Sequence, residues 1–307
     1  LGIDVGTSST KAALIQPDGR CVGLGTEAYD VETPRPGWAE QHPETWLDAT
    51  VHAVRRALAQ AHVDPSRIRG LGLSGQMHGT ICLDGDGHPI RPAIIWADQR
   101  SGSEVAWVNE TLGTERLAEW TGNPLATGFM LSTWLWLKAH APEATAETAT
   151  LLLPKDYVRY RMTGRLGTEP SDASSTSLFN PRTRAWSTAL LEKLDLDRSK
   201  LPDIAPSAAI SGGLSPDVAG RMGLCVDTPV IFGGSDQAMQ AFGNGVMTPG
   251  TLSSTIGTGG QLFAPTGEPV IGPELRMHSF CHMLPDRWHV ETAMLSAGLS
   301  LRWLRDH

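Results

Sequence analysis

One acidic residue, Asp236, follows a short apolar run and two glycines, at a point where a helix is expected to begin. A strand that passes through glycines into a helix leaves backbone amides and the carboxylate exposed at the strand's carboxyl end. Open α/β sheets bind their ligands at that end. The segment 229–245 therefore offers Asp236 as the candidate catalytic residue, and the rest of the chain must supply what this carboxylate acts on.

A second carboxylate, Asp4, stands beside a turn rich in small and hydroxylated residues. Gly6 permits a tight turn, Thr7 and Ser8 offer amides and hydroxyl groups to an anion, and Lys11 begins the next strand. Successive amides in such a turn form a concave nest for phosphate oxygens. A carboxylate beside it can hold Mg²⁺ through the ion's water shell, because Mg²⁺ gives up water reluctantly. An ordinary hairpin around a hydrogen-bonded Asp4 explains the same residues equally well.

Met77 and His78 lie between glycines directly after an expected strand, where a small polar ligand would meet them. A core methionine and a hydrogen-bonded structural histidine are the plainer explanation. The preceding residues 70–75 match GxGxxG, but they lead into another strand and not into a helix, which argues against a dinucleotide site. Asp98 and Arg100 end a further apolar strand, and we expect them to pair with each other.

Near the end of the chain, His278, His282 and His289 together with Cys281 suggest a metal site. The surrounding residues read as two strands of a hairpin, and zinc requires better ligand spacing than this. We therefore do not expect a zinc site there.

The elements that must position these residues follow an α/β pattern with mixed strand pairing. Residues 1–31 read as three strands joined by tight turns. Residues 43–62 give the clearest helix, because apolar residues recur there at spacings of three and four. Helices are also expected at 101–112, 186–194, 217–222 and 297–307, two strands around a glycine turn within 250–265, and strands at 276–284 and 287–295.

Composition narrows the possible partners. A net charge of −8, with lysine and arginine scattered singly, does not favour nucleic acid or an anionic membrane. The four cysteines form no CxxC pair and indicate reduced thiols, not a disulfide framework. No apolar run approaches the ~20 residues of a membrane span, and no basic-then-apolar leader is present. Because the chain opens inside an expected strand, we expect a few residues, the initiator included, to precede it.

Taken together and in order, these motifs resemble the FGGY family of carbohydrate kinases, and within it the xylulokinases. The resemblance extends over essentially the whole chain, and QMHG at 76–79 favours xylulokinase over glycerol kinase or gluconokinase. The matching stretches are GIDVGTSSTK (2–11), GLSGQMHG (72–79), IIWADQR (94–100), LLLPKDYVRYRMTG (151–164), SDAS (171–174), FGGSDQA (232–238), STIGTGG (254–260) and HSFCHMLPDRWH (278–289).

This resemblance implies an actin-like, ribonuclease-H-like fold whose two lobes close on a sugar and ATP. Residues 1–245 would form the N-terminal lobe, and residues 246–307 the incomplete start of the C-terminal lobe. The implied reaction is the ATP-dependent phosphorylation of D-xylulose to D-xylulose 5-phosphate, with Mg²⁺, in the cytoplasm, by a possible homodimer. Another ketose or polyol as substrate, or a non-catalytic sugar- or nucleotide-binding relative, are the alternatives.

The resemblance also assigns roles to residues. Asp236 would be the general base facing the sugar's C5 hydroxyl, with Met77, His78 and Gln237 beside the sugar. Asp4 would act at the metal and phosphates, as a catalytic and metal-binding residue. The nucleotide phosphates would meet Gly6, Thr7, Ser8 and Lys11 in the first lobe and Gly257, Thr258 and Gly259 in the second.

Three positions depart from the family pattern. Thr133 replaces a lysine, Ser175 stands where a glycine is expected, and Gln237 replaces the asparagine of many xylulokinases. The change at Gln237 falls in the implied sugar pocket and is the reason for keeping other sugars as alternatives.

Overall fold

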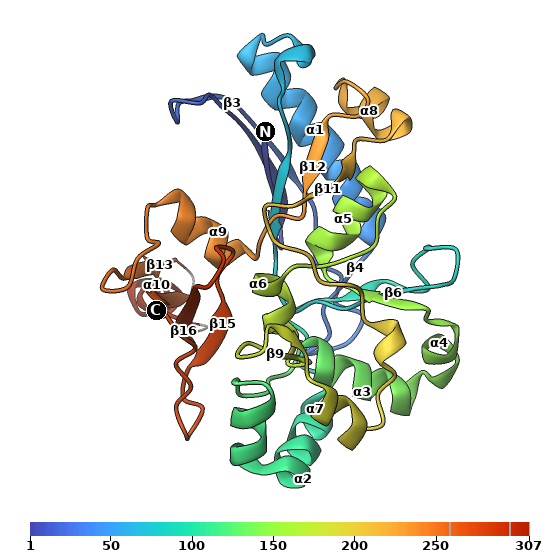
Figure 1. Cartoon of the computed structure of the whole chain (residues 1–307), viewed down its shortest axis with the longest axis vertical. Helices are drawn as coiled ribbons and strands as arrows, with labels where there is room; N and C mark the ends of the chain where they lie inside the picture. Colours follow the sequence, from blue (N-terminus) through green and yellow to red (C-terminus); the bar gives the residue numbers. More distant parts are fainter. Residues whose placement is uncertain (258, 295, 307) are drawn as a thin grey trace.

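The computed structural model describes residues 1–257, 259–294 and 296–306. Its first sheet has the strand order β3-β2-β1-β5, with β1 antiparallel to β2 and parallel to β5 (Figure 1). A parallel bridge between Leu71 and Val230 connects this sheet to the antiparallel pair β11–β12. The strands are β1 (Gly2–Val5), β2 (Ser9–Ile15), β3 (Cys21–Ala28), β5 (Gly72–Gly75), β11 (Ile210–Gly213) and β12 (Pro229–Ile231).

Helix α1 (Pro43–Ala61) covers the β2–β3 part of this sheet. The contact is close because β3 presents glycines to the helix. A Cβ atom on Gly25 would lie 1.9 Å from the carbonyl oxygen of Ala53, and one on Gly23 would lie 2.3 Å from that of Ala57. Helices α5 (Pro154–Thr163) and α8 (Pro216–Met222) complete this apolar core.

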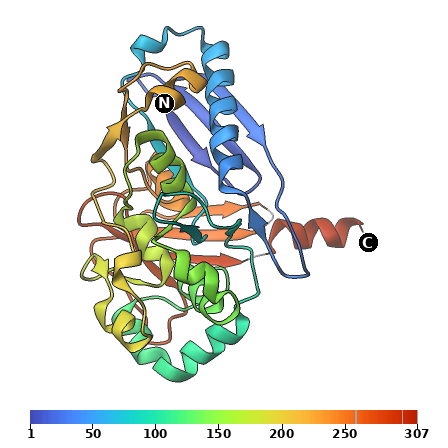
Figure 2. The same ribbon diagram turned by 90° about the vertical axis from the view of Figure 1, so that its right-hand side faces the viewer.

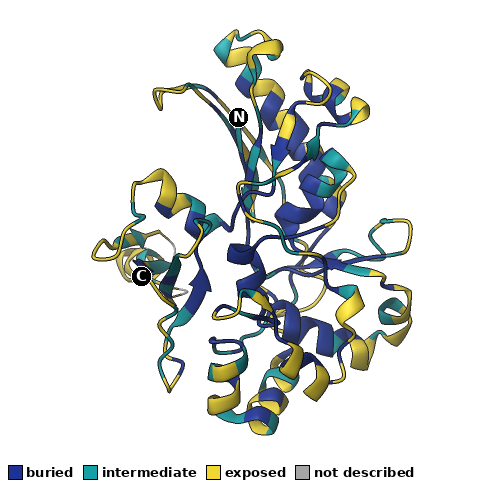
Figure 3. Cartoon of the chain, viewed as in Figure 1, coloured by how far each residue is buried: buried dark blue, intermediate teal, exposed yellow. Residues whose placement is uncertain are grey.

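A second core lies below the first in Figure 1 and is mainly helical. Figure 3 shows buried residues towards the middle of this region and exposed ones at its periphery. Its short strands pair as β4–β7, β6–β8 and β9–β10. The remaining elements before β11 are α2 (Gly102–Trp120), α3 (Met130–His140), α4 (Pro142–Glu147), α6 (Pro170–Ala173) and α7 (Thr188–Lys193), the 3₁₀ turns η1 (Pro65–Arg67), η2 (Ser174–Thr176) and η3 (Arg198–Lys200), and strands β4 (Glu40–Gln41), β6 (Ile81–Leu83), β7 (Ala93–Ile94), β8 (Thr150–Leu152), β9 (Phe179–Asn180) and β10 (Ala185–Trp186).

After α9 (Asp236–Gly243) the chain forms a separate antiparallel sheet in the order β13-β14-β16-β15. Helix α10 (Gly298–Asp306) projects from the body of the molecule (Figure 2) and has no buried residue. The strands are β13 (Ser253–Ile256), β14 (Gly260–Thr266), β15 (His278–Cys281) and β16 (Trp288–Met294).

Most of the predicted elements are confirmed, including the three opening strands, helix α1 and the final helix. Strands β6 and β7 pair with β8 and β4, and the segment between them folds back through the antiparallel bridges Thr80–Ile94 and Leu83–Pro89. All four cysteines are free thiols. Among the described residues, no helix has both the length and the apolar character needed to cross a membrane.

Candidate active site

Asp236 is the first residue of α9, directly after β12 and the two glycines, as the sequence predicts. Gly233 has a φ of +85°, and a Cβ there would lie 2.0 Å from the carbonyl oxygen of Leu73, so only glycine fits this close passage beside β5. Asp236 is half-buried, and its Oδ1 accepts a hydrogen bond from the Gln237 amide at 2.6 Å. The carboxylate is thus held at a helix N-terminus.

Two further carboxylates influence Asp236. Burial, followed by repulsion from Glu291 and then Asp4, raises the pKa of Asp236 to about 8. Burial likewise raises the pKa of Glu291, on β16, to about 7. This pKa lies well above the ~3.9 of an unperturbed aspartate, so Asp236 is largely protonated at pH 7 in the ligand-free site.

Asp4 lies within β1 and faces the same site. Its Oδ1 accepts a hydrogen bond from the Ser74 hydroxyl on β5 at 2.9 Å. In the part of the chain that the structure describes, neither Asp4, Asp236 nor Glu291 forms an ion pair with a lysine or arginine. Three carboxylates that have no lysine or arginine within ion-pair distance, among the described residues, suit a divalent ion. No three metal-ligating side chains in the described residues lie close enough to hold an ion directly, so a water-mediated contact through Asp4 fits best.

The first turn is fixed by surrounding side chains. The Thr7 hydroxyl accepts a hydrogen bond from Trp96 Nε1 at 2.8 Å and donates to Gln76 Oε1 at 3.3 Å. Gln41 Nε2 donates to the Thr7 carbonyl at 2.8 Å, and the Tyr29 hydroxyl donates to the Gly6 carbonyl at 2.5 Å. The Thr7 hydroxyl is therefore already hydrogen-bonded to Trp96 and Gln76, and only the backbone of the turn is available to bind an anion.

Ser8 and Lys11 are exposed beside this turn. Lys11 stands directly opposite Asp4 in the antiparallel pairing of β1 and β2, so their side chains lie on one face of the sheet. The structure thus brings Asp4, Gly6, Ser8 and Lys11 together, as the sequence predicts.

His78 follows β5 with a φ of +69°, a conformation that is unusual for a non-glycine residue. Its Nδ1 lies 2.7 Å from the carbonyl oxygen of Ser175, and its ring stacks on Phe129 with centroids 3.9 Å apart. Burial lowers the pKa of His78 to about 3, so the ring is neutral. Because a carbonyl can only accept, Nδ1 carries the proton and Nε2 is left as an acceptor. Met77 beside it is buried.

The second turn lies against the start of α10. The Gly298 amide donates to the Gly257 carbonyl at 3.0 Å, and the Gly257 amide donates to the Gly259 carbonyl at 2.8 Å. A Cβ on Gly298 would lie 2.3 Å from the Gly257 oxygen, which requires glycine. The turn therefore adjoins a helix N-terminus, a favourable setting for an anion. Thr258, predicted to bind phosphate, lies outside the described residues.

Asp98 and Arg100 do pair with each other, as predicted. Arg100 Nη2 lies 2.7 Å from Asp98 Oδ2, and its Nη1 lies 2.7 Å from Glu40 Oε1. The guanidinium also covers the Trp38 ring at 3.6 Å. These buried contacts give the pair a structural role.

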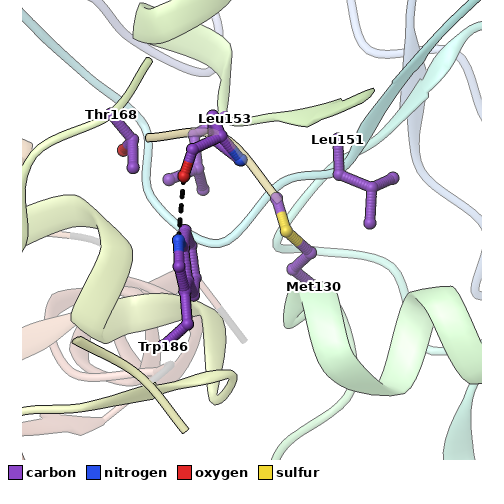
Figure 4. Close-up of a pocket in the computed structure, with 6 residues that line it drawn as sticks. Met130, Leu151, Leu153, Thr168 and Trp186 are labelled. Atoms are coloured by element: carbon purple, nitrogen blue, oxygen red, sulfur yellow. Dashed lines mark hydrogen bonds between the residues drawn. The ribbon is translucent and has the colours of Figure 1, made fainter. Parts of the chain in front are cut away.

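A small apolar pocket opens elsewhere, in the second core (Figure 4). It is lined by Met130, Leu151, Leu153 and Trp186 and has no room for a water-sized molecule. The dashed line marks the hydrogen bond from Trp186 Nε1 to the Pro202 carbonyl at 2.8 Å. Lacking titratable groups, this pocket is packing space and not the site of chemistry.

Sequence reasoning missed two groups at the site. Glu291 is a lone acid in an otherwise uncharged strand, a signal that was available in the sequence. Gln41 Oε1 accepts from both Gln76 Nε2 and Trp46 Nε1, which ties α1 to the first turn. The hydrogen bond from Gln76 to Gln41 joins residues far apart in the chain, and no local sequence pattern predicts it.

The sequence of the chain matches a known protein family. The N-terminal domain of the FGGY family of carbohydrate kinases matches residues 1–243. The chain is 39% identical over 303 residues to the xylulose kinase of Escherichia coli K12 and 35% identical over 305 residues to that of Bacillus subtilis 168. These alignments cover 99% of this chain but only 62% and 61% of those relatives.

A solved structure of a xyloylose (xylulose) kinase from Brucella ovis superposes with a TM-score of 0.91 at 36% identity. The match covers 98% of this chain and 62% of that one. It confirms the predicted sugar-kinase fold class, with mixed sheets flanked by helices. The chain belongs to the FGGY family of carbohydrate kinases.

Proposed function

We propose that the protein phosphorylates D-xylulose with ATP to give D-xylulose 5-phosphate. One observation carries the proposal: the Asp236 carboxylate starts a helix beside Asp4 in a chain 39% identical to a xylulose kinase. A phosphoryl transfer requires mainly positioning and charge stabilisation, with a carboxylate that receives the hydroxyl proton.

In this reaction Asp236 orients the C5 hydroxyl of the sugar. The hydroxyl oxygen forms a bond to the γ-phosphorus of ATP, the bond from that phosphorus to the bridging oxygen breaks, and ADP leaves. The hydroxyl proton passes to the ionised form of Asp236. When bound beside Asp4 through its water shell, Mg²⁺ would offset the phosphate charge and lower the pKa of Asp236.

The remaining predicted residues take consistent roles. His78 Nε2 accepts a hydrogen bond from a sugar hydroxyl, while Met77 and Gln237 border the sugar. The first turn, from Gly6 to Ser8, and Lys11 meet one set of phosphate oxygens. The second turn, at Gly257 and Gly259, meets another at the start of α10.

We also propose that the chain divides into an N-terminal lobe, residues 1–245, and the first part of a C-terminal lobe, residues 246–307. The sheet β13–β16 contains only later residues, and the family's N-terminal domain ends at 243. An enzyme that consumes ATP and a free sugar belongs in the cytoplasm, where both are found. Homodimer formation stays a prediction, which sedimentation equilibrium can test.

A coupled ADP assay with a panel of ketoses and polyols tests the activity. We expect ADP release with D-xylulose. The Asp236→Asn variant should lower kcat by at least ~100-fold, as loss of a general base does, and leave sugar binding by calorimetry largely intact. The control is Asp217→Asn, which removes a carboxylate from the first turn of α8, away from the site.

Other outcomes decide between the alternatives. Undiminished turnover by Asp236→Asn would remove Asp236 from the role of base. Preference for another ketose or a polyol would replace D-xylulose as substrate. Sugar binding without sugar-stimulated ADP release would instead identify a non-catalytic relative.

A further inference from the structure

A cluster of charged side chains lies fully buried behind Asp236. Lys155 Nζ lies 2.8 Å from Asp156 Oδ1, 3.3 Å from Asp172 Oδ2 and 3.4 Å from Glu169 Oε1, with every side chain wholly inaccessible. Burying charges carries a large desolvation cost, so such a cluster is weak evidence for stability in itself. The presence of this buried cluster is therefore better explained by a role in the neighbouring site.

Glu169 connects this cluster to α6. Its carboxylate accepts from the Ser171 and Asp172 amides at 2.8 and 2.9 Å and from the Ser171 hydroxyl at 2.8 Å. The Ser207 hydroxyl donates to it at 2.7 Å. The Ser171 hydroxyl is therefore fixed in direction: it donates its proton in a hydrogen bond to Glu169, and its lone pairs are free to accept.

That oxygen accepts from the amide of Ser235 at 2.9 Å, the residue immediately before Asp236. Ser235 is fully buried, and its own hydroxyl does not cap the helix. The Ser171 oxygen thus accepts the hydrogen bond of the last backbone amide before α9. An oxygen that donates to a carboxylate is a stronger acceptor, because hydrogen bonds in a chain polarise one another.

The same segment also holds the other side of the site. The Ser175 carbonyl binds His78 Nδ1, and the Ser174 hydroxyl accepts from the Cys281 amide of β15 at 3.1 Å. Figure 3 shows α6 buried at this junction, next to β15. Residues 169–176 therefore contact the entry to α9, the loop after β5 and the C-terminal sheet at once.

We propose that Ser171 is a positioning residue for Asp236: its hydroxyl, fixed by buried Glu169, holds the Ser235 amide and so sets the place of the carboxylate at the start of α9. This inference rests on the proposed function, in which Asp236 receives the sugar's proton. A shift of about 1 Å at a reacting group can lower a rate about 100-fold, so the hydrogen bond bears directly on kcat.

The test compares Ser171→Ala with Ser207→Ala. Each removes one buried hydroxyl that donates to Glu169, but only the first leaves the Ser235 amide without its acceptor. For Ser171→Ala we expect kcat to fall at least tenfold with the KM for ATP within threefold. For Ser207→Ala both constants should stay within threefold of the unmodified protein. Equal losses in the two variants, or no loss in Ser171→Ala, would overturn the proposal.

Hydrogen–deuterium exchange supplies a second readout that needs no turnover. Peptides covering 233–242 should exchange at least fivefold faster in Ser171→Ala than in the unmodified protein, and at an unchanged rate in Ser207→Ala. Unchanged exchange in Ser171→Ala would contradict the positioning role. An unmodified protein that releases no ADP with any sugar would count against the proposed function alone, because the exchange comparison still decides the role of Ser171.

Discussion

His78 Nδ1 lies 2.7 Å from the carbonyl oxygen of Ser175, 97 residues along the chain. This contact fixes which ring nitrogen carries the proton, because the oxygen can only accept. The pKa of His78, lowered to about 3 by burial, keeps the ring neutral. A stacked, neutral imidazole with a free acceptor is suited to a hydroxyl group and not to a phosphate.

Replacing His78 by phenylalanine should preserve the stacking on Phe129 while removing the acceptor. We expect the KM for the sugar to rise at least tenfold, about the effect of one lost hydrogen bond in a desolvated site, with the KM for ATP little changed. His140→Phe is a matched control, since His140 also stacks on an aromatic ring, that of Trp136, and also binds a backbone carbonyl through Nδ1, but is exposed. Equal sugar KM values for the two variants would contradict the role of His78.

The pH profile should report Asp236. Its pKa of about 8 means that the ionised form gains population as pH rises. At low Mg²⁺ we therefore expect kcat/KM for the sugar to increase with pH with a midpoint near pH 8, and the midpoint to move to lower pH as Mg²⁺ is raised. Initial rates at limiting sugar over pH 6–9 measure this. If the pH midpoint of kcat/KM does not change with Mg²⁺ concentration, the ion does not bind near these carboxylates.

Removing the buried cation Lys155 should strongly destabilise the fold. Burial alone lowers the pKa of Lys155, but the attraction of Asp156, Asp172 and Glu169 outweighs it and raises that pKa. Lys155→Met leaves Asp172 and Glu169 without a cation in ion-pair contact, while Asp156 keeps only Arg159 Nε at 3.6 Å. Breaking such a buried cluster costs about 3–5 kcal/mol of unfolding free energy. Urea denaturation at pH 7.5 measures the loss. Lys138→Met, at an exposed lysine that binds the Asp195 carbonyl, should lose less than about 1 kcal/mol.

His289 should make the protein sensitive to acid. Burial lowers its pKa to about 3, and neither ring nitrogen has a hydrogen-bond partner among the described residues. Because the unfolded histidine titrates near 6.5, the unfolded state binds the proton first, and stability is lost as pH falls from about 6.5 towards 3.

His289→Phe removes that contribution and keeps the stacking on Phe263. Between pH 7.5 and pH 5 the variant should lose up to about 2 kcal/mol less unfolding free energy than the unmodified protein. Urea denaturation at both pH values measures the difference, with His52→Phe, at an exposed position, as the control. An unchanged pH dependence in His289→Phe would mean that the His289 ring does not cause the loss of stability in acid.

The sequence by itself determined the elements whose pattern is local. The spacing of Leu47, Val51, Val54 and Leu58 specifies one face of α1, and the glycines before Asp236 specify the passage into α9. The pairing of Asp98 with Arg100 was also predictable, because only two positions separate them. The ordered motifs were enough to identify the FGGY family.

Only the tertiary structure decided the electrostatics of the site. The raised pKa of Asp236 depends on burial and on Glu291, which arrives from a different sheet. The neutral state of His78 depends on its burial, its tautomer depends on the Ser175 carbonyl, and the support of α9 depends on Ser171. Burial and charge separation are properties of distances in space, and residues separated by tens of positions acquire them only when the chain is folded.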